Sequence, residues 1–226
     1  MRSAVSRSSP SSSPKAGRRK GARRAAVRAL GLRKTVRRDN RRQRLLDAAA
    51  GQFRECGFAA ASMRAIAGQA DMLAGSAYYH FPSKEELLVA VHEEGIRRIT
   101  AAVATALEGA SDPWDRLEAA CAAHLAQLLD GGDYAQVVLR DLPHEAEIVR
   151  ARLVALRDGY EAVFRRLIAA LPLPADADRG LLRLMLMGAL NWSPRWYRAR
   201  GVAPAKIAQT FVAALRRPLD PRRGNR

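Results

Sequence analysis

The residues between Ser62 and Lys84 include several side chains that can donate hydrogen bonds to a nucleic acid. They are Ser62, Arg64, Ser76, Tyr78, Tyr79, His80 and Lys84. Hydroxyl, imidazole and ammonium groups bind phosphate oxygens, and a guanidinium or hydroxyl group can also reach base edges. Two small residues among them, Ala74 and Gly75, would let the backbone approach a groove closely. This combination predicts DNA recognition rather than catalysis.

No other part of the chain has the residue spacing of a catalytic or metal site. The histidines are scattered, at His80, His92, His124 and His144, and neither a glycine-rich phosphate loop nor a nucleophile elbow is present. The acids around His144 (Asp141, Glu145 and Glu147) could hold a divalent cation, but the simpler interpretation is that they favour the dipole of a helix that begins there. We therefore expect no catalytic residues, no metal, no cofactor and no enzymatic activity.

The spacing of apolar residues places the donor-bearing stretch on two short helices. Ser62 can cap the first helix, on which Met63, Ile66 and Ala67 share one face. Residues 70–72 form a turn, in which Asp71 can adopt a left-handed backbone. The second helix covers about 73–81, with Ala77 directed inward. The pattern predicts a helix-turn-helix.

The flanking residues complete a three-helix unit. A helix over about 40–56 should end at Gly57, with Phe58 folding back onto it. After Pro82, Ser83 can cap a long helix in a capping box with Glu86. The N–H groups at that helix start, together with the Lys84 ammonium, predict a phosphate site.

This arrangement resembles the TetR family of one-component bacterial transcriptional regulators over roughly residues 40–95. The matching residues are Gly57, Phe58, Ser62, Ile66, Ala67, Ala70, Gly75, Tyr78, His80, Phe81, Ser83, Lys84 and Glu85. The chain departs from the family pattern at Gln52, Asp71, Leu73 and Ala77, where the family usually has an aliphatic residue, Gly, a Ser or Thr cap and an aliphatic residue, respectively. A helical hairpin whose tyrosines only pack is the alternative.

The residues and the resemblance together predict the DNA-binding set. It comprises Ser62, Arg64, Leu73, Ala74, Gly75, Ser76, Tyr78, Tyr79, His80 and Lys84. Within it, Arg64, Ala74, Ser76 and Tyr79 are expected at base edges, and Tyr78, His80 and Lys84 on phosphates.

The composition predicts an all-α protein with a basic arm. Ala, Leu and Arg are abundant, and the formal charge is +17 over 226 residues. Residues 1–37 hold 12 Lys or Arg and no acid, which leaves 27 basic and 22 acidic residues elsewhere. We expect a disordered arm (1–37), a DNA-binding domain (38–82), an effector-binding and dimerisation domain (83–217) and a basic tail (218–226). The arm could follow phosphates or enter a minor groove, or it could be a solvated tail or an over-extended start.

The C-terminal half is larger than a DNA-binding unit needs. Helices are expected at 83–108, 114–130, 134–140, 145–171, 178–196 and 205–217. In the TetR-like interpretation, the last two helices pair with their symmetry mates in a homodimer. The expected dimer residues are Met185, Leu186, Ile207, Phe211 and Leu215. An ordinary monomer core is the alternative.

A second resemblance concerns the segment from Asn191 to Gly201. It is similar to the C-terminal domains of TetR-like regulators of fatty-acid or steroid breakdown, several of which respond to acyl-coenzyme A. Asn191 and Trp192 offer polar tips on an apolar helix, which suits a mostly apolar ligand. We expect both to contact a small apolar or acyl-CoA-like effector, with Arg140, Arg150, Arg183 and Arg195 near its phosphates. The alternative is that the tryptophans fill a corner of the bundle.

The remaining features favour a cytoplasmic protein. Cys56 and Cys121 have no CxxC partner, so buried, reduced thiols are expected. No apolar run approaches the roughly 20 residues of a membrane span, and no signal-peptide core follows the basic N-terminus.

The interpretation that unites these features is a homodimeric, ligand-responsive DNA-binding transcriptional regulator that is released from its double-stranded operator by the effector. A non-specific DNA-compacting protein is the first alternative, because the arm alone would bind any DNA. A nucleic-acid-modifying enzyme is the second.

Overall fold

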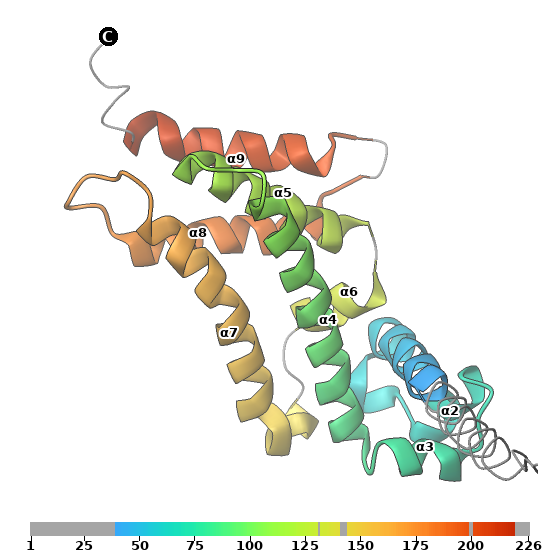
Figure 1. Ribbon diagram of the computed structural model, residues 1–226. Coiled ribbons are helices and arrows are strands. Elements are labelled where there is room, and N and C mark those ends of the chain that lie inside the picture. Colours follow the sequence, from blue (N-terminus) through green and yellow to red (C-terminus); the bar gives the residue numbers. More distant parts are fainter. Residues whose placement is uncertain (1–38, 131, 141–143, 199–200, 220–226) are drawn as a thin grey trace, which may run out of the picture. The chain divides into compact units, whose positions relative to one another are not determined.

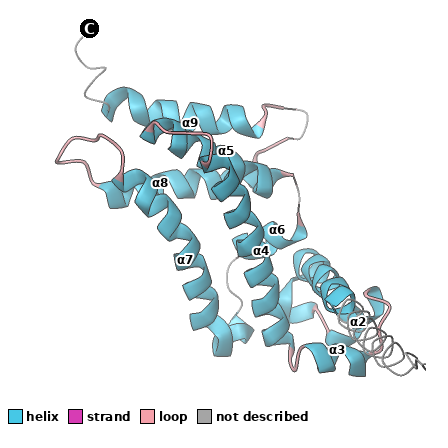
Figure 2. Ribbon diagram, viewed as in Figure 1, coloured by secondary structure: helices cyan, strands magenta, loops and turns pink. Residues whose placement is uncertain are grey.

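The computed structural model describes residues 39–130, 132–140, 144–198 and 201–219, and every regular element among them is helical (Figures 1 and 2). This confirms the all-α prediction. The predicted basic arm (1–37) and most of the basic tail lie outside the described residues. The residues from Arg44 onward form one compact unit.

The DNA-binding unit consists of a first helix over residues 39–60, α2 (Met63–Gln69) and α3 (Ala74–His80). Gly57 has the predicted left-handed backbone, with φ of +80°, but helical hydrogen bonding continues past it to residue 60. Phe58 folds back as predicted, with its ring centroid 5.7 Å from that of Phe53. Asp71 in the turn also has a positive φ, of 52°. The side chains of Ile66 and Ala77 are fully buried and join the three helices.

Lys84, the first residue of α4 (Lys84–Leu107), binds the end of the first helix. Its Nζ donates hydrogen bonds to the carbonyl oxygens of Phe58, Ala59 and Ala61 over 2.7, 3.3 and 3.0 Å, and lies 4.3 Å from the Phe58 ring centroid. An ammonium has three N–H donors and is favoured at a helix C-terminus. The phosphate contact predicted for the Lys84 ammonium is therefore replaced by a structural role, because its donors are already used.

The predicted cap of α4 is present. The Ser83 hydroxyl accepts a hydrogen bond from the Glu86 N–H over 3.2 Å. The Glu86 carboxylate does not complete a capping box. Instead it accepts a hydrogen bond of 2.6 Å from Arg152.

The helices after α4 follow the predicted order with shifted ends. They are α5 (Pro113–Leu129), α6 (Asp133–Leu139), α7 (Arg150–Ala169), α8 (Arg179–Trp192) and α9 (Pro204–Leu219). The helix predicted from 145 begins only at Arg150, because a 3₁₀ turn (His144–Val149) precedes it and Ala146 has a non-helical backbone. Helix α8 ends at Trp192 and is followed by a 3₁₀ turn (Ser193–Arg195). Helix α9 continues past the predicted stop, to Leu219.

Two apolar cores hold these helices. The first joins the three DNA-binding helices to the start of α4, to α6 and to the beginning of α7, through residues such as Leu87, Tyr134 and Leu153. The second lies among α4, α5, α7, α8 and α9, and contains Trp114, Phe164 and Leu190. Helices α4 and α7 contribute residues to both cores and therefore connect them.

The remaining sequence predictions have mixed outcomes. Cys121 is buried, as predicted, and burial raises the pKa of its thiol to about 12, but Cys56 is exposed, so that expectation was wrong. No group of His, Cys, Asp or Glu side chains among the described residues could hold a metal, and Asp141 lies outside them. Every helix in the described ranges is too short or too polar to span a lipid bilayer.

The contacts of Lys84 generate the first prediction. Lys84→Met keeps the aliphatic chain but removes three donors, so the free energy of unfolding should fall by about 1–3 kcal/mol. Lys206→Met is a matched control, because Lys206 bonds only an exposed neighbour, Gln209. Urea unfolding of both variants measures the difference. Unchanged stability of Lys84→Met, with weaker binding to every DNA sequence, would restore the phosphate assignment.

Candidate DNA-binding surface and ligand cavity

The outward face of α3 presents small residues and two exposed tyrosines. Tyr79 is 72% exposed and Tyr78 is 52% exposed, and Gly75 and Ser76 lie exposed beside them. A Cβ added at Gly75 would meet no atom within 4 Å, so this face is open. The Tyr79 and His80 rings meet edge to face, with centroids 5.6 Å apart. The face therefore has the shape and the donors that a groove-binding helix requires.

The start of α3 is held by the turn rather than by a side-chain cap. Leu73, at the cap position, is 81% exposed and makes no capping hydrogen bond. Instead, Asp71 pairs with Arg44 of the first helix over 2.5 Å. On α2, the Ser62 hydroxyl is used as the helix cap and accepts from the Ala65 N–H over 3.2 Å. Arg64 is exposed on that helix.

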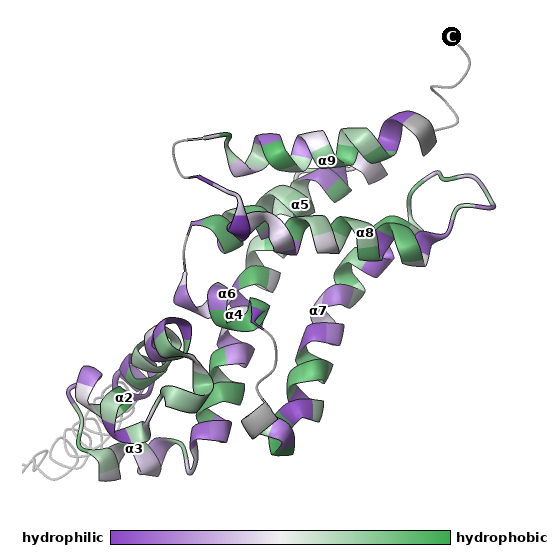
Figure 3. Ribbon diagram, turned by 180° about the vertical axis from the view of Figure 1, so that it is seen from behind, coloured by the Kyte–Doolittle hydropathy of each residue, from purple (hydrophilic) through white to green (hydrophobic). Residues whose placement is uncertain are grey.

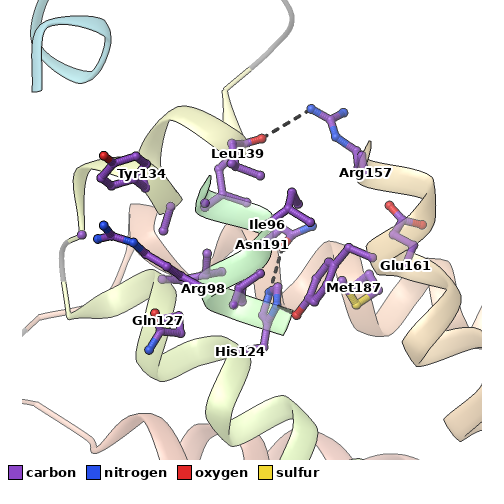
Figure 4. A pocket seen from close by; sticks show the side chains of 17 residues that line it. Ile96, Arg98, His124, Gln127, Tyr134, Leu139, Arg157, Glu161, Met187 and Asn191 are labelled. Carbon is purple, nitrogen blue, oxygen red and sulfur yellow. Dashed lines mark hydrogen bonds between the residues drawn. The ribbon is translucent and has the colours of Figure 1, made fainter. Parts of the chain in front are cut away.

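The described part of the chain also contains a cavity of about 220 Å³ that is lined by five helices (Figure 4). The lining includes Gly95, Ile96, Arg98 and Ile99 of α4, His124, Gln127 and Leu128 of α5, Tyr134, Ala135, Val138 and Leu139 of α6, Arg157, Tyr160 and Glu161 of α7, and Met187 and Asn191 of α8. The walls are mainly apolar, with a few polar groups, which is the usual composition of a small-molecule site.

A chain of hydrogen bonds crosses one wall of the cavity. The Tyr160 hydroxyl lies 2.7 Å from His124 Nδ1, and His124 Nε2 lies 3.0 Å from Asn191 Oδ1. Because an amide oxygen only accepts, Nε2–H donates to Asn191 and Nδ1 accepts from Tyr160. The Asn191 Nδ2 group has no hydrogen-bond partner among the described residues. The cavity wall therefore offers an amide N–H donor.

Burial keeps the side chains of this hydrogen-bonded series uncharged. Burial lowers the pKa of His124 to about 4, although the hydrogen bond to Asn191 acts in the opposite direction. Burial likewise raises the pKa of the Tyr160 hydroxyl above its ordinary range. Both groups are therefore neutral near pH 7, and a ligand here meets hydrogen-bonding dipoles rather than a charge.

The charged side chains of the cavity are engaged with other parts of the protein. Glu161 pairs with Arg183 of α8, and Arg157 reaches the Val138 carbonyl at 3.5 Å. Arg98 binds Glu94 over 2.6 Å and stacks on the Tyr134 ring, with its Cζ 4.2 Å from the centroid. The pKa of Glu94 is lowered to about 2, chiefly by its hydrogen bond to Arg97.

Of the two predicted effector residues, the structure brings only Asn191 to the cavity. Trp192 is 59% exposed and lies on the outer face of α8, where Arg195 covers its ring with Cζ 4.6 Å from the centroid. Successive helical residues differ by about 100° in direction. Trp192 therefore does not line this cavity, whereas Asn191 does.

The predicted dimer residues divide into three groups by exposure. Leu186 and Ile207 are buried in the protomer's own core, so they were wrongly assigned to a dimer surface. Phe211 and Leu215 are half-buried against the same core, and Met185 is exposed. The exposed large apolar residues of α8 are Leu181, Leu184, Met185 and Trp192. Positions 184 and 185 lie three and four residues after 181, and 192 lies seven after 185, so the four side chains share one side of the helix. Figure 3 shows that α8 is largely hydrophobic. This stripe was missed because the inward and outward faces of α8 are both apolar.

The four arginines predicted near a coenzyme phosphate already have partners. Arg140 donates to the Arg54 carbonyl, Arg150 pairs with Glu147, Arg183 pairs with Glu161, and Arg195 covers Trp192. The arginines that do line the cavity, Arg98 and Arg157, were not singled out from the sequence. Nor were His124, Tyr134 and Tyr160. The sequence signal that could have identified these residues is a polar side chain on an otherwise apolar helix face.

Comparisons with known proteins give a consistent result. Residues 45–91 match a family model described as bacterial regulatory proteins of the tetR family, and residues 110–219 match a tetracyclin repressor-like C-terminal domain. The chain is 30% identical to the HTH-type transcriptional repressor KstR2 of Mycobacterium tuberculosis, over 78% of this chain and 92% of that protein. It is 31% identical to the HTH-type transcriptional activator FasR of Mycolicibacterium smegmatis, over 69% and 73%.

A solved structure shares the fold. The crystal structure of AibR in complex with isovaleryl coenzyme A and operator DNA superposes with a TM-score of 0.67 at 22% identity, over 77% of this chain and 97% of that chain.

The buried histidines generate the second prediction. In the unfolded chain His124 has a pKa near 6.5, and in the folded protein it is about 4. The unfolded state therefore binds more protons between these values, and stability should fall as pH drops from 6.5, by up to about 1.4 kcal/mol per pH unit for one proton. His92 acts in the same direction, because burial also lowers its pKa. Urea unfolding between pH 7.5 and 5 should show this slope, and His124→Gln should reduce it. An identical slope in His124→Gln would assign the titration to other groups.

Proposed function

This chain belongs to the TetR family of bacterial transcriptional regulators, and we propose that it is a homodimeric repressor that releases its operator when an apolar or acyl-bearing ligand enters the cavity. One observation carries the proposal. An open, donor-bearing helix face and a mainly apolar cavity occur in the same compact unit, and α4 contributes to the core beneath each.

The DNA contacts would come from α2, α3 and the start of α4. Arg64, Ala74, Ser76 and Tyr79 would face base edges. Leu73 and Gly75 would lie against the walls of the DNA groove, and Tyr78 and His80 would bind phosphates. Ser62 acts through the position of α2, since its hydroxyl caps that helix. A phosphate at the start of α4 would be bound by backbone N–H groups rather than by the Lys84 ammonium.

The dimer surface would be the apolar stripe of α8, formed by Leu181, Leu184, Met185 and Trp192. Exposed apolar side chains at helical spacing are stabilised by burial against a second apolar surface. Packing of α8 and α9 against their symmetry mates would form a four-helix bundle about a two-fold axis. Two copies of α3 would then read two half-sites of one operator.

The chemistry of the cavity supports an effector with a largely apolar body and an uncharged polar group. The apolar walls suit an alkyl or ring system, and the Asn191 amide could donate to a carbonyl oxygen. Two related proteins are in line with this chemistry. AibR was solved with isovaleryl coenzyme A, and KstR2 is named a ketosteroid transcriptional regulator.

The mechanism would be a shift between two populations. A ligand weakens operator binding only by the ratio of its affinities for the DNA-competent and DNA-incompetent states. The cavity, at about 220 Å³, is smaller than the roughly 300–1,000 Å³ of typical ligand sites. A larger ligand would therefore have to move the cavity lining, which would supply the difference in affinity.

Selection of DNA from a random pool, followed by ligand titration, tests the proposal. The pure protein should enrich one palindromic sequence, and isovaleryl or palmitoyl coenzyme A should release that DNA whereas free coenzyme A should not. Equal binding of all sequences at physiological salt would favour DNA compaction by the basic residues 1–37. If the protein enriches one DNA sequence but neither thioester releases that DNA, the proposal of an acyl-bearing effector is contradicted, whereas the DNA-binding function still stands.

The third prediction separates base readout from phosphate binding. Tyr79→Phe should lose about 1–3 kcal/mol of discrimination at one operator position. Tyr78→Phe, the matched change at the neighbouring tyrosine, should weaken all sequences about equally. Competition binding with single-base operator variants measures both effects. The assignment is wrong if the two variants show the opposite pattern.

The fourth prediction concerns the dimer. Leu184→Glu places a charge in the proposed interface and should yield monomers at micromolar concentration, with a loss of operator affinity. Ile148→Glu is the matched control, because Ile148 is 86% exposed and lies before α7, outside the stripe. Sedimentation velocity measures the association state. A dimeric Leu184→Glu protein would place the interface elsewhere.

A further inference from the structure

We infer that Tyr134 and Arg98 form a latch through which the cavity controls the first DNA-binding helix. This inference rests on the proposed function, because it concerns the response of that cavity to its ligand. The latch is defined as the contacts that these two side chains make with Asp47 of the helix over residues 39–60. Neither Tyr134, Arg98 nor Asp47 belongs to the helix-turn-helix itself.

The geometry of the latch is a hydrogen bond reinforced by stacking. The Tyr134 hydroxyl donates to Asp47 Oδ1 over 2.7 Å. Arg98 lies over the Tyr134 ring, with Cζ 4.2 Å from the centroid, and its Nη2 is 3.9 Å from the same carboxylate oxygen. A hydrogen bond to a charged acceptor is stronger than one between neutral groups. Burial also raises the pKa of Tyr134, so its hydroxyl keeps the proton that it donates.

The same two side chains line the ligand cavity (Figure 4). Tyr134 is only 5% exposed, and its ring lies between the cavity and the hydroxyl that holds Asp47. A ligand that displaces this ring or the Arg98 stem must also move the groups that bind Asp47. The cavity and the DNA-binding unit therefore share these side chains directly, without intermediate residues.

A second contact fastens α6 to the first helix. Asp133 Oδ1 lies 2.6 Å from Arg54 Nε, and Arg140, just after α6, donates to the Arg54 carbonyl. Asp47 and Arg54 are seven residues apart, so they lie on the same side of their helix. Helix α6 thus contacts the first helix at both of its ends, and displacement of α6 would be transmitted to the first helix along two turns.

Close packing of α6 on α4 makes the latch sensitive to small movements. A Cβ built at Gly95 would lie 2.8 Å from Val138 Cγ2 and 3.2 Å from the Tyr134 carbonyl oxygen. The two helices therefore approach as closely as a glycine permits, and there is no slack between them. Because the cavity, at about 220 Å³, is also small, a ligand group larger than this volume would have to separate α6 from its neighbours.

The direction of the change in operator affinity follows from the contacts of the latch. In the conformation described, Tyr134 holds Asp47, and the first helix supports α2 and α3 in one arrangement. Ligand entry moves Tyr134 and Arg98, releases Asp47 and allows the DNA-binding helices to leave that arrangement. Operator affinity then falls.

The first test removes a single oxygen atom. Tyr134→Phe keeps the ring in the cavity wall but cannot bind Asp47. Operator affinity without ligand should fall about three- to ten-fold, and the further weakening by isovaleryl or palmitoyl coenzyme A should shrink towards one-fold. Asp47→Ala should do the same, and the double variant should show no additional loss. Arg152→Gln is the control, because it breaks the Arg152–Glu86 contact, which lies outside the cavity lining.

A second test needs no ligand. Gly95→Ala inserts a methyl group between α4 and α6 and should weaken operator binding in the wild-type background. In the Tyr134→Phe background it should add little, because the latch is already open. Thermal unfolding of each variant confirms that the fold persists.

The outcomes separate the latch from the proposed function. Wild-type protein that is insensitive to both thioesters contradicts the acyl-bearing effector, while the Gly95→Ala pair still tests the latch. Additive effects of Gly95→Ala and Tyr134→Phe would overturn the latch, as would a Tyr134→Phe protein whose operator affinity and ligand response equal those of the wild type.

Discussion

The close approach of α4 and α6 at Gly95 is the constraint on which the functional arrangement depends. Any side chain there would overlap Val138 and crowd the Tyr134 backbone. Because Gly95 has none, Tyr134 can close one wall of the cavity with its ring and reach Asp47 with its hydroxyl. The site that would bind the ligand and the helices that would bind DNA are thereby separated by a single side chain.

Helix α4 has a second structural task at its opposite end. Lys84 binds three carbonyl oxygens at the end of the first helix, and Ser83 caps α4 itself. The first turn of α4 therefore moves with the DNA-binding unit, while Gly95 and Arg98, three to four turns later, belong to the cavity wall. A rigid helix fixed in this way would convert a small displacement beside the cavity into a displacement of the DNA-binding helices.

Sequence patterns over a few residues were sufficient to predict the DNA-binding unit but not the cavity. The Ser62 and Ser83 caps, the left-handed Asp71 and the inward Ala77 each depend on neighbours within a few residues, so spacing alone revealed them. Lys84 was misassigned because its partners lie more than twenty residues away. On α8 both faces are apolar, so the sequence could not separate the buried Leu186 from the exposed Leu184, nor the inward Asn191 from the outward Trp192. The His124–Tyr160 contact joins two helices, and no periodicity within either helix encodes it.

The central claim is that the cavity and the DNA-binding helices are thermodynamically linked, and reciprocity tests this most directly. The dissociation constant of isovaleryl coenzyme A should be measured by calorimetry for the free protein and for its operator complex. The operator affinity should be measured with and without the same ligand. Linkage requires the operator to weaken ligand binding by the same factor as the ligand weakens operator binding, and we expect that factor to be at least about five. Equal affinity of the ligand for free and operator-bound protein would contradict the account.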